Sequence, residues 1–122
     1  MSQSARRYGR LAEERAADRY GFNREEGGWY DGRYKNGTPV EVKAARPDGE
    51  LRLWEDDHKT LARQQGYYVF GKSRPHGRGI HVFGMVRRKA TDVTGLVPRW
   101  NRANHRLKGP QRQYKLPIGR VL

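Results

Sequence analysis

The sequence of 122 residues contains no cysteine, and this absence excludes several kinds of chemistry. Without thiols the chain has no disulfide framework, no thiolate zinc site and no cysteine nucleophile. Long apolar runs are also missing, since none approaches the roughly 18 to 20 residues that a membrane-spanning helix needs. The amino terminus lacks the apolar segment of a secretory signal. We therefore expect a cytoplasmic protein without a membrane partner.

Acidic residues are scarce relative to basic ones. The chain has 13 Asp and Glu against 26 Lys and Arg, which gives a formal net charge of +13. This is more positive charge than solubility requires, and it indicates a polyanionic partner. Only 34% of the residues are hydrophobic, but three Trp, seven Tyr and three Phe provide enough apolar surface for a folded protein. The length has room for one compact domain, predicted over residues 1–122.

The excess of positive charge is concentrated near the carboxyl terminus. Residues 86–122 hold ten basic residues and one acidic residue, Asp92. Because so many like charges repel one another, nucleic-acid binding is favoured over a merely solvated surface. Phosphate contacts are predicted for Arg87, Arg88, Lys89, Arg99, Arg102, Arg106, Lys108, Arg112, Lys115 and Arg120.

Apolar residues within the same segment argue against a purely disordered tail. Trp100, Tyr114 and the run Leu116-Pro117-Ile118 are suited to anchor it. We expect a core of about residues 6–87, followed by a basic C-terminal extension at 88–122 whose irregular structure is pinned by these anchors. Trp100 and Tyr114 have a second interpretation, in which they stack on unpaired bases.

Hydrophobic spacing and turn residues predict an α/β domain with a mixed sheet. Ala12, Ala16 and Tyr20 recur at helical spacing before Gly21, and Asn36-Gly37 is a strong hairpin signal. The predicted elements are a helix at 10–20, strands at 28–34 and 38–44, a helix at 53–65, and strands at 67–70 and 80–87. The Gly- and Pro-rich stretch at 72–79 is expected to be a mobile loop near the binding groove, with no sign of base-specific recognition.

Three charged residues of the predicted hairpin form a candidate hydrolytic site. Period-two geometry points Glu41 and Lys43 to the same side of their strand, and the hairpin carries Asp31 alongside them. Neighbouring carboxylates repel each other and are stabilised by a hard divalent cation such as Mg²⁺. That ion polarises a phosphoryl oxygen and lowers the pKa of its bound water, while Lys43 orients the attacking water. Alternatively, the three residues are solvent-facing charges on a polar sheet face.

The order of Asp31 and then Glu41-Val42-Lys43 resembles the signature of the PD-(D/E)xK nuclease superfamily, which includes restriction enzymes and archaeal Holliday junction resolvases. Gly9-Arg10-Leu11-Ala12-Glu13 resembles the first helix of the resolvase-like branch, where a glutamate contributes to the metal site. Residues 51–70 resemble its second helix and following strand. The likeness covers about residues 6–72, with Tyr30 where the signature has proline.

This resemblance implies a restriction-endonuclease-like core, a mixed β-sheet flanked by helices, and the activity of a Mg²⁺-dependent endodeoxyribonuclease in which Mn²⁺ substitutes for Mg²⁺. Asp31 and Glu41 are then metal ligands, Lys43 is the water-orienting residue and Glu13 is an auxiliary ligand. The resemblance also implies DNA as the partner and a homodimer, with branched, nicked and ordinary duplexes all open as substrates. Two alternatives stay open, a non-catalytic nucleic-acid-binding module on the same fold and an RNA-processing nuclease.

Polar residues of the predicted second helix have competing interpretations. His58 shares an inward face with Trp54 and Leu61. It is suited either to hydrogen-bond a metal-bound water or phosphate, or to be a satisfied, half-buried histidine. The acidic run Glu55-Asp56-Asp57 is better explained by the helix dipole than by metal binding.

Overall fold

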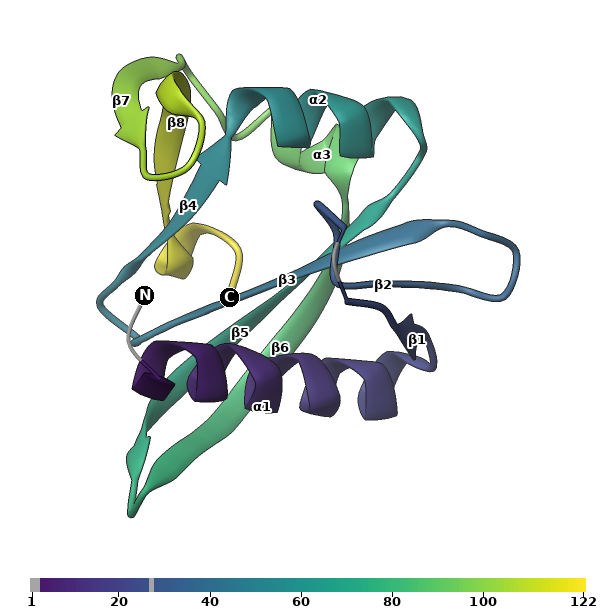
Figure 1. Ribbon diagram of the computed structural model, residues 1–122, viewed down its shortest axis with the longest axis vertical. Coiled ribbons are helices and arrows are strands. Elements are labelled where there is room, and N and C mark those ends of the chain that lie inside the picture. The colour runs from purple at the N-terminus through teal and green to yellow at the C-terminus, as the bar shows by residue number, and fades with distance from the viewer. Residues whose placement is uncertain (1–2, 27) are drawn as a thin grey trace.

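The polypeptide forms a five-stranded mixed sheet and a separate three-stranded antiparallel sheet. The computed structural model describes residues 3–26 and 28–122, and the side chains from residue 9 onward. Its elements are α1 (Gln3–Tyr20), β1 (Asn23–Arg24), β2 (Gly32–Arg33), β3 (Pro39–Ala45), β4 (Glu50–Trp54), α2 (Glu55–Arg63), β5 (Tyr67–His76), β6 (Gly79–Lys89), α3 (Ala90–Thr94), β7 (Asn101–His105), β8 (Gly109–Pro117) and a 3₁₀ helix, η1 (Ile118–Arg120). Figure 1 shows α1 lying across the large sheet, and α2 beside α3 and the small sheet.

The large sheet has the strand order β1-β2-β3-β5-β6, and only its β3–β5 pair is parallel. Val40 lies opposite Tyr67 at one end of that pair and Ala45 opposite Lys72 at the other. Parallel neighbours need a crossover connection, which β4 and α2 provide. The predicted α/β class, with a mixed sheet flanked by helices, is confirmed. Within the described part of the chain, no helix is long and apolar enough to span a membrane.

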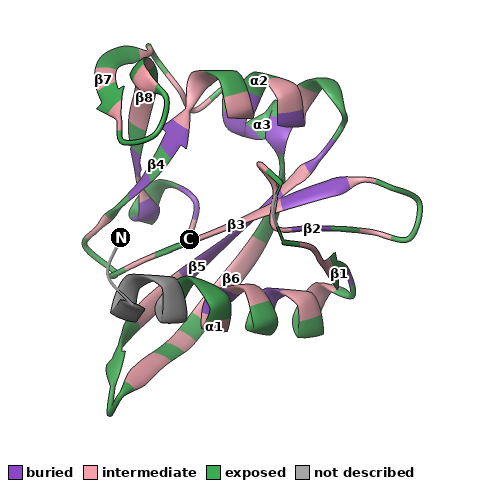
Figure 2. Ribbon diagram, viewed as in Figure 1, coloured by how far each residue is buried: buried purple, intermediate pink, exposed green. Residues whose placement is uncertain are grey.

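Alternation along β5 gives the large sheet an apolar cluster on each face. Val69 packs with Ala16 of α1, whereas Tyr68 and Phe70 pack with Leu61 of α2 in a second cluster. Figure 2 shows buried segments on β3, β4 and β5 and on the helices beside them. The second cluster also contains Leu51, Leu53, Ala90, Val93, Leu116, Ile118 and Val121.

The carboxyl-terminal third has regular structure, so the expectation of an irregular extension at 88–122 is wrong. Its strand β8 lies in the middle of the small sheet, between β4 and β7. Leu116 on β8 and Ile118 on η1 are fully buried in the second cluster. The anchors identified in the sequence are core residues, and their burial is what orders the basic segment. A single domain over residues 1–122 stays a prediction.

The second helix begins later than expected. Leu51 and Leu53 are buried on β4, where they pair with Leu116 and Tyr114 of β8. Trp54 is the last residue of the strand and the helix starts at Glu55. Helical spacing extended the prediction back to residue 53, but pairing with a strand 60 residues away in sequence is not visible in local periodicity.

The predicted hairpin is confirmed at its turn and wrong in its first strand. Gly37, with a φ of +92°, donates its N–H to the Tyr34 carbonyl at 2.9 Å, as expected for Asn-Gly. However, residues 28–31 bend, and β2 is limited to Gly32–Arg33. Trp29 packs against the second cluster and against Tyr30, with ring centroids 5.0 Å apart, which draws this stretch away from the strand ladder. Strand β1 was not predicted.

The stretch 72–79 is a β-hairpin and not a mobile loop. β5 continues to His76 and β6 begins at Gly79, with Gly77 at a φ of +59° in the turn. Pro75 lies opposite Ile80 in the ladder. Because β3 pairs with β5 only as far as Lys72, the proline falls where β5 has become an edge strand, the position in a sheet that tolerates it.

Truncating Leu116 should destabilise the whole fold if the carboxyl-terminal third belongs to the core. Leu116 is fully buried, so we expect Leu116→Ala to lower the free energy of unfolding by about 2–5 kcal/mol. The matched control is Leu107→Ala, because Leu107 is 88% exposed and its truncation should change little. Urea unfolding followed by far-UV circular dichroism measures both. Equal stability of the two variants would contradict this role for β8.

Candidate active site

Strand β3 places Glu41 and Lys43 on the face that carries the second cluster. Their register partners on β5 are Tyr68 and Phe70, both members of that cluster. Glu41 Oε1 lies 3.1 Å from Lys43 Nζ, and the two side chains are 12% and 22% exposed. The predicted neighbourhood of these residues is therefore present, as a half-buried ion pair.

Two hydrogen bonds hold Asp31 against the backbone of β3, one from its main-chain N–H and one to its side chain. Its N–H donates to the Val40 carbonyl at 2.9 Å, and its carboxylate Oδ2 accepts from the Val42 N–H at 2.7 Å. The next residue is Gly32, where a side chain would meet the Asn23 carbonyl and the Phe22 ring. Close packing of β1, β2 and β3 thus fixes Asp31 beside the segment that carries Glu41.

Helix α1 brings Glu13 to the same place. Glu13 lies close enough to Asp31 to raise the pKa of its carboxyl group. Arg24 on β1 donates from Nη2 to Glu13 Oε2 at 3.1 Å and from Nη1 to Glu14 Oε1 at 3.5 Å. Arg24 therefore holds the auxiliary carboxylate in position. Sequence reasoning missed Arg24 because a single arginine in a two-residue strand leaves no pattern.

The pKa of Asp31 is raised from its ordinary value of 3.8 to about 7. Burial is the largest cause, and the charge and hydrogen bond of Glu13 and the charge of Glu41 raise it further. The Val42 N–H acts in the opposite direction by stabilising the carboxylate. The Asp31 carboxyl therefore keeps its proton to a much higher pH than an exposed aspartate does.

A cleft of about 410 Å³ lies beside Glu13. Its lining includes Glu13 on α1, Val42 on β3, Arg46 after β3, and Arg74 and Ile80 on the β5–β6 hairpin. Glu13 lines the cleft, so a ligand in the cleft can contact this carboxylate. Two arginines at its wall make the cleft suited to an anion.

The carboxylates fit a hard divalent cation through their chemistry. Such an ion, like a proton, offsets the repulsion between neighbouring carboxylates, and it prefers oxygen ligands. In the described residues no group of three or more His, Asp or Glu is arranged to hold a metal ion. Glu13 and Glu41 both act on Asp31 through their charges, and Glu41 is at the same time ion-paired with Lys43.

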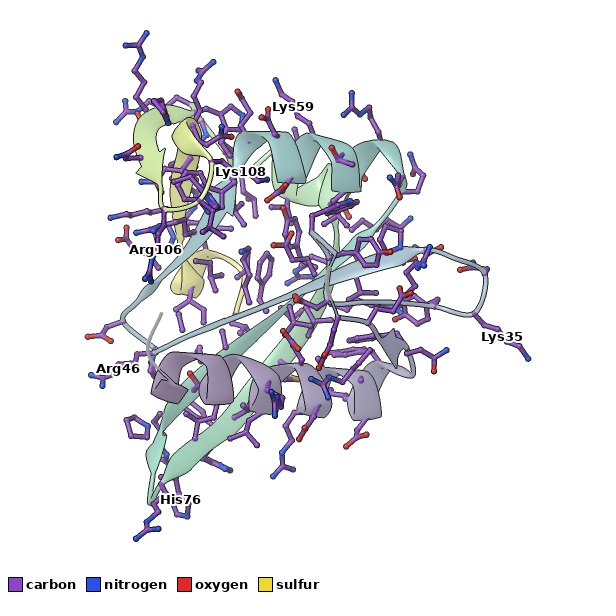
Figure 3. All side chains as sticks on the ribbon, viewed as in Figure 1. Lys35, Arg46, Lys59, His76, Arg106 and Lys108 are labelled. Atoms are coloured by element: carbon purple, nitrogen blue, oxygen red, sulfur yellow. The ribbon has the colours of Figure 1, made fainter. Side chains whose placement is uncertain are left out.

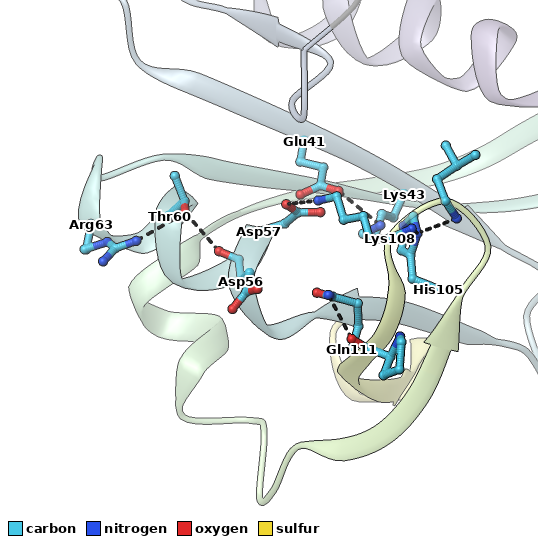
Figure 4. A network of polar contacts seen from close by, with 11 residues as sticks. Glu41, Lys43, Asp56, Asp57, Thr60, Arg63, His105, Lys108 and Gln111 are labelled. Carbon is cyan, nitrogen blue, oxygen red and sulfur yellow. Dashed lines mark hydrogen bonds and ion pairs between the residues drawn. The ribbon is translucent and has the colours of Figure 1, made fainter.

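A second ion pair lies beside Glu41 and Lys43. Lys108, in the turn between β7 and β8, has its Nζ 3.4 Å from Asp57 Oδ1 at the start of α2. Figure 4 shows the two pairs close together, and burial, followed by the charges of Glu41 and Asp57, raises the pKa of Tyr68. The small sheet thus brings a cation from residue 108 to the face that carries Lys43.

The structure supports the structural interpretation of His58 and not the auxiliary catalytic one. His58 is 1% exposed, with Nδ1 2.8 Å from the Tyr68 hydroxyl and Nε2 2.7 Å from the Thr94 hydroxyl. Both ring nitrogens therefore have protein partners, and neither is left for a metal-bound water or a phosphate. Burial, followed by the nearby charge of Lys59, lowers the pKa of His58 and favours the neutral ring.

The predicted phosphate-binding residues are exposed but do not form one patch. Arg87 belongs to β6 of the large sheet, where its guanidinium lies 4.6 Å from the Tyr67 ring centroid and donates to the Tyr34 hydroxyl at 2.8 Å. Arg102 and Arg112 face each other on the small sheet. The other exposed members are Arg88, Lys89, Arg99, Arg106, Lys108, Lys115 and Arg120.

The aromatic and acidic residues near the small sheet serve packing and charge balance. Trp100 and Tyr114 pack against the second cluster, which favours their role as anchors over base stacking. Glu55 lies 3.5 Å from Lys59 and 3.7 Å from Arg112. The acidic run is in the first turn of α2, as the dipole argument predicts, and it also fastens the basic strands to that helix.

Comparison with known protein families gives one match. The family model described as a PD-(D/E)XK nuclease superfamily domain matches residues 1–122. No curated protein matches the chain at a significant level.

The raised pKa of Asp31 should be visible in how the free energy of unfolding depends on pH. Because the pKa is about 7 in the folded protein and about 4 in the unfolded chain, the folded state binds more protons between these values, and the free energy of unfolding falls as pH rises through this window. Asp31→Asn removes this penalty. We expect the variant to be more stable than wild type by more than about 1 kcal/mol at pH 8, and the difference to shrink towards pH 4.

Urea unfolding in EDTA at a series of pH values measures this difference. Asp48→Asn is the control, because Asp48 is exposed, lies after β3 and is not one of the candidate carboxylates. A stability difference for Asp31→Asn that does not depend on pH would show that Asp31 is not protonated in the folded protein.

Proposed function

The chain belongs to the PD-(D/E)XK nuclease superfamily, and from this premise we propose that it is a divalent-metal-dependent endonuclease that hydrolyses phosphodiester bonds in DNA. One observation carries the proposal. The Asp31 carboxylate is hydrogen-bonded to the backbone of the strand that bears the Glu41–Lys43 pair, and the charge of Glu13 acts on it as well. A surface or ion-pair role would not require carboxylates to be gathered at the cost of a raised pKa.

Each residue has a distinct task in this proposal. Asp31 and Glu41 hold the cation, with Glu13 as an auxiliary ligand. Mg²⁺, or Mn²⁺ in its place, would supply Lewis-acid activation of the phosphate and of water. Lys43 orients the attacking water and offsets the negative charge that develops on the phosphate. Arg24 keeps Glu13 in reach, and Asp31 holds the proton that must leave before two carboxylates can accept a cation.

The charge of the molecule supports nucleic acid as the substrate. A net charge of +13 attracts the phosphate backbone without regard to sequence. Preference for branched DNA, as in the resolvase-like branch, and assembly as a homodimer with one site for each strand are further proposals. An RNA substrate and a non-catalytic binding role are the alternatives that the first experiment separates.

Replacing Lys43 should abolish cleavage and preserve binding. We expect Lys43→Ala to reduce the cleavage rate by at least about 100-fold, because the ammonium group no longer stabilises the developing charge. Supercoiled, linear and four-way-junction DNA and a matched RNA are the substrates, each tested with Mg²⁺, Mn²⁺ or EDTA, while fluorescence anisotropy follows binding. Lys59→Ala, which removes an exposed lysine of α2, should cut like wild type.

Two outcomes would overturn this assignment. If the wild type binds DNA with a steep salt dependence but cuts no substrate with either metal, the chain is a binding module. If it cuts only the RNA, the substrate class is wrong although the chemistry stands.

Cation binding should depend on pH in the opposite sense to proton binding at Asp31. We expect Mg²⁺ or Mn²⁺ to raise the melting temperature of the wild type at pH 8 and to raise it much less at pH 5.5, where a proton occupies Asp31. Asp31→Asn should lose this stabilisation at both pH values. Scanning calorimetry measures it, with Asp48→Asn as the control. Equal stabilisation of wild type and Asp31→Asn would place the cation elsewhere.

A further inference from the structure

The hairpin of β5 and β6 extends beyond the rest of the large sheet. β3 pairs with β5 as far as Lys72, whereas the pairing of β5 with β6 continues from Ser73 to His76. Figure 1 shows this hairpin projecting past α1, and Figure 3 places His76 at its end. We call residues 73–83 the β5–β6 ribbon. A register shift between Lys72 and Ser73 marks the point where the ribbon leaves the sheet.

The ribbon carries only positive formal charge. The chain has no acidic residue between Asp57 and Asp92. Arg74 and Arg78 are exposed on the ribbon, and none of the ion pairs between described residues involves either of them. These two cations are therefore available to an anionic partner, in contrast to Lys108 and Arg112, which pair with acidic residues of α2.

Side chains on the ribbon are held in a row by contacts with one another. The Arg74 guanidinium lies 5.3 Å from the Phe83 ring centroid, and the His81 ring stacks on Phe83 at 6.2 Å with an angle of 20°. His76 continues the row, 6.2 Å from His81. Phe83 is 42% exposed although large apolar side chains are normally buried. The row is thus preorganised and exposed to solvent, as a recognition surface is.

The base of the ribbon also forms a wall of the cleft that Glu13 lines. Arg74 and Ile80 belong to that wall. A polyanion that contacts Arg74 and Arg78 along the ribbon is therefore led to the cleft. This continuity connects the ribbon to the substrate and not to an unrelated partner.

We propose that the β5–β6 ribbon enters the major groove of double-stranded DNA, which makes duplex DNA the substrate; this inference rests on the proposed nuclease function. The major groove of B-DNA, about 12 Å wide, admits a two-stranded β-ribbon. The deep, narrow major groove of an RNA duplex does not. Arg74 and Arg78 contact phosphates or guanine edges, and the row of rings lies against the groove floor.

Binding measurements in EDTA test the ribbon independently of cleavage. The probes are a labelled DNA duplex of about two helical turns, the same sequence as duplex RNA and as single-stranded DNA, and a DNA duplex whose cytosines carry glucosylated 5-hydroxymethyl groups that fill the major groove. For the plain DNA duplex, we expect Arg74→Ala and Phe83→Ala each to weaken binding by about tenfold or more. Glucosylation should weaken wild-type binding similarly, and duplex RNA should bind more weakly than duplex DNA.

Matched variants control for charge and folding. Lys59→Ala removes one exposed lysine on α2 and should bind like wild type. Arg74 and Phe83 are exposed, and unchanged urea midpoints for their variants would show that the fold is intact. Phe83→Leu retains an apolar side chain but not the stacked ring, and should bind as weakly as Phe83→Ala.

The outcomes separate the ribbon from the nuclease chemistry. Unchanged duplex binding by the ribbon variants, indifference to glucosylation, or an equal loss of affinity for single-stranded DNA or duplex RNA would each overturn the groove proposal. Ribbon-dependent duplex binding in a protein that cuts no nucleic acid with Mg²⁺ or Mn²⁺ would overturn the nuclease proposal and leave the groove contact standing.

Discussion

The parallel pairing of β3 with β5 is the constraint on which the rest of the structure depends. Two parallel strands cannot be joined by a turn, so the chain between them must leave the sheet and return. Here that excursion contains β4 and α2, and these elements build the second core against Tyr68 and Phe70. The same pairing fixes the orientation of β3, and with it the face on which Glu41 and Lys43 lie.

The site combines opposing electrostatic demands in a small volume. The protein is strongly basic, yet its three candidate carboxylates lie near one another, and their mutual effect is partly balanced by Arg24 and Lys43. These two cations act on different acids, Arg24 on Glu13 and Lys43 on Glu41. Asp31, which has only a backbone N–H to stabilise its charge, is the residue whose pKa rises. Burial, together with the neighbouring carboxylates, thus makes Asp31 the acid of this group that holds a proton most strongly.

Much of this arrangement could be predicted from the sequence because its signals are local. The spacing of Ala12, Ala16 and Tyr20 identified α1, and Asn36-Gly37 identified the turn that carries β3 beside Asp31. The hairpin signal was enough to predict that Asp31 lies beside Glu41 and Lys43, whereas the place of Glu13 was implied by the resemblance of the first helix to the resolvase-like branch. The roles of these residues in catalysis stay proposals.

The rest depended on contacts between distant parts of the chain. β4 is a strand because β8 pairs with it, and Pro75 is tolerated in β5 because β3 has already ended. Helical spacing put His58 on an inward face, where one interpretation gave it a role in the site. In the structure, both of its ring nitrogens are hydrogen-bonded, to the hydroxyl groups of Tyr68 and Thr94. In each case the distant residues that decide the structure could not be identified from the local sequence.

The central position of β8 in the small sheet also determines when, during synthesis of the chain, the fold can be completed. During synthesis β4 and α2 emerge early, but Leu51 and Leu53 have no strand to pair with until residues 109–117 follow them. The face bearing Glu41 and Lys43 is therefore closed only late in translation. A ribosome-bound chain that has reached β6 already carries the candidate acids and the cationic ribbon without a finished core beneath them, so the cell acquires the assembled site only after β8 has been made.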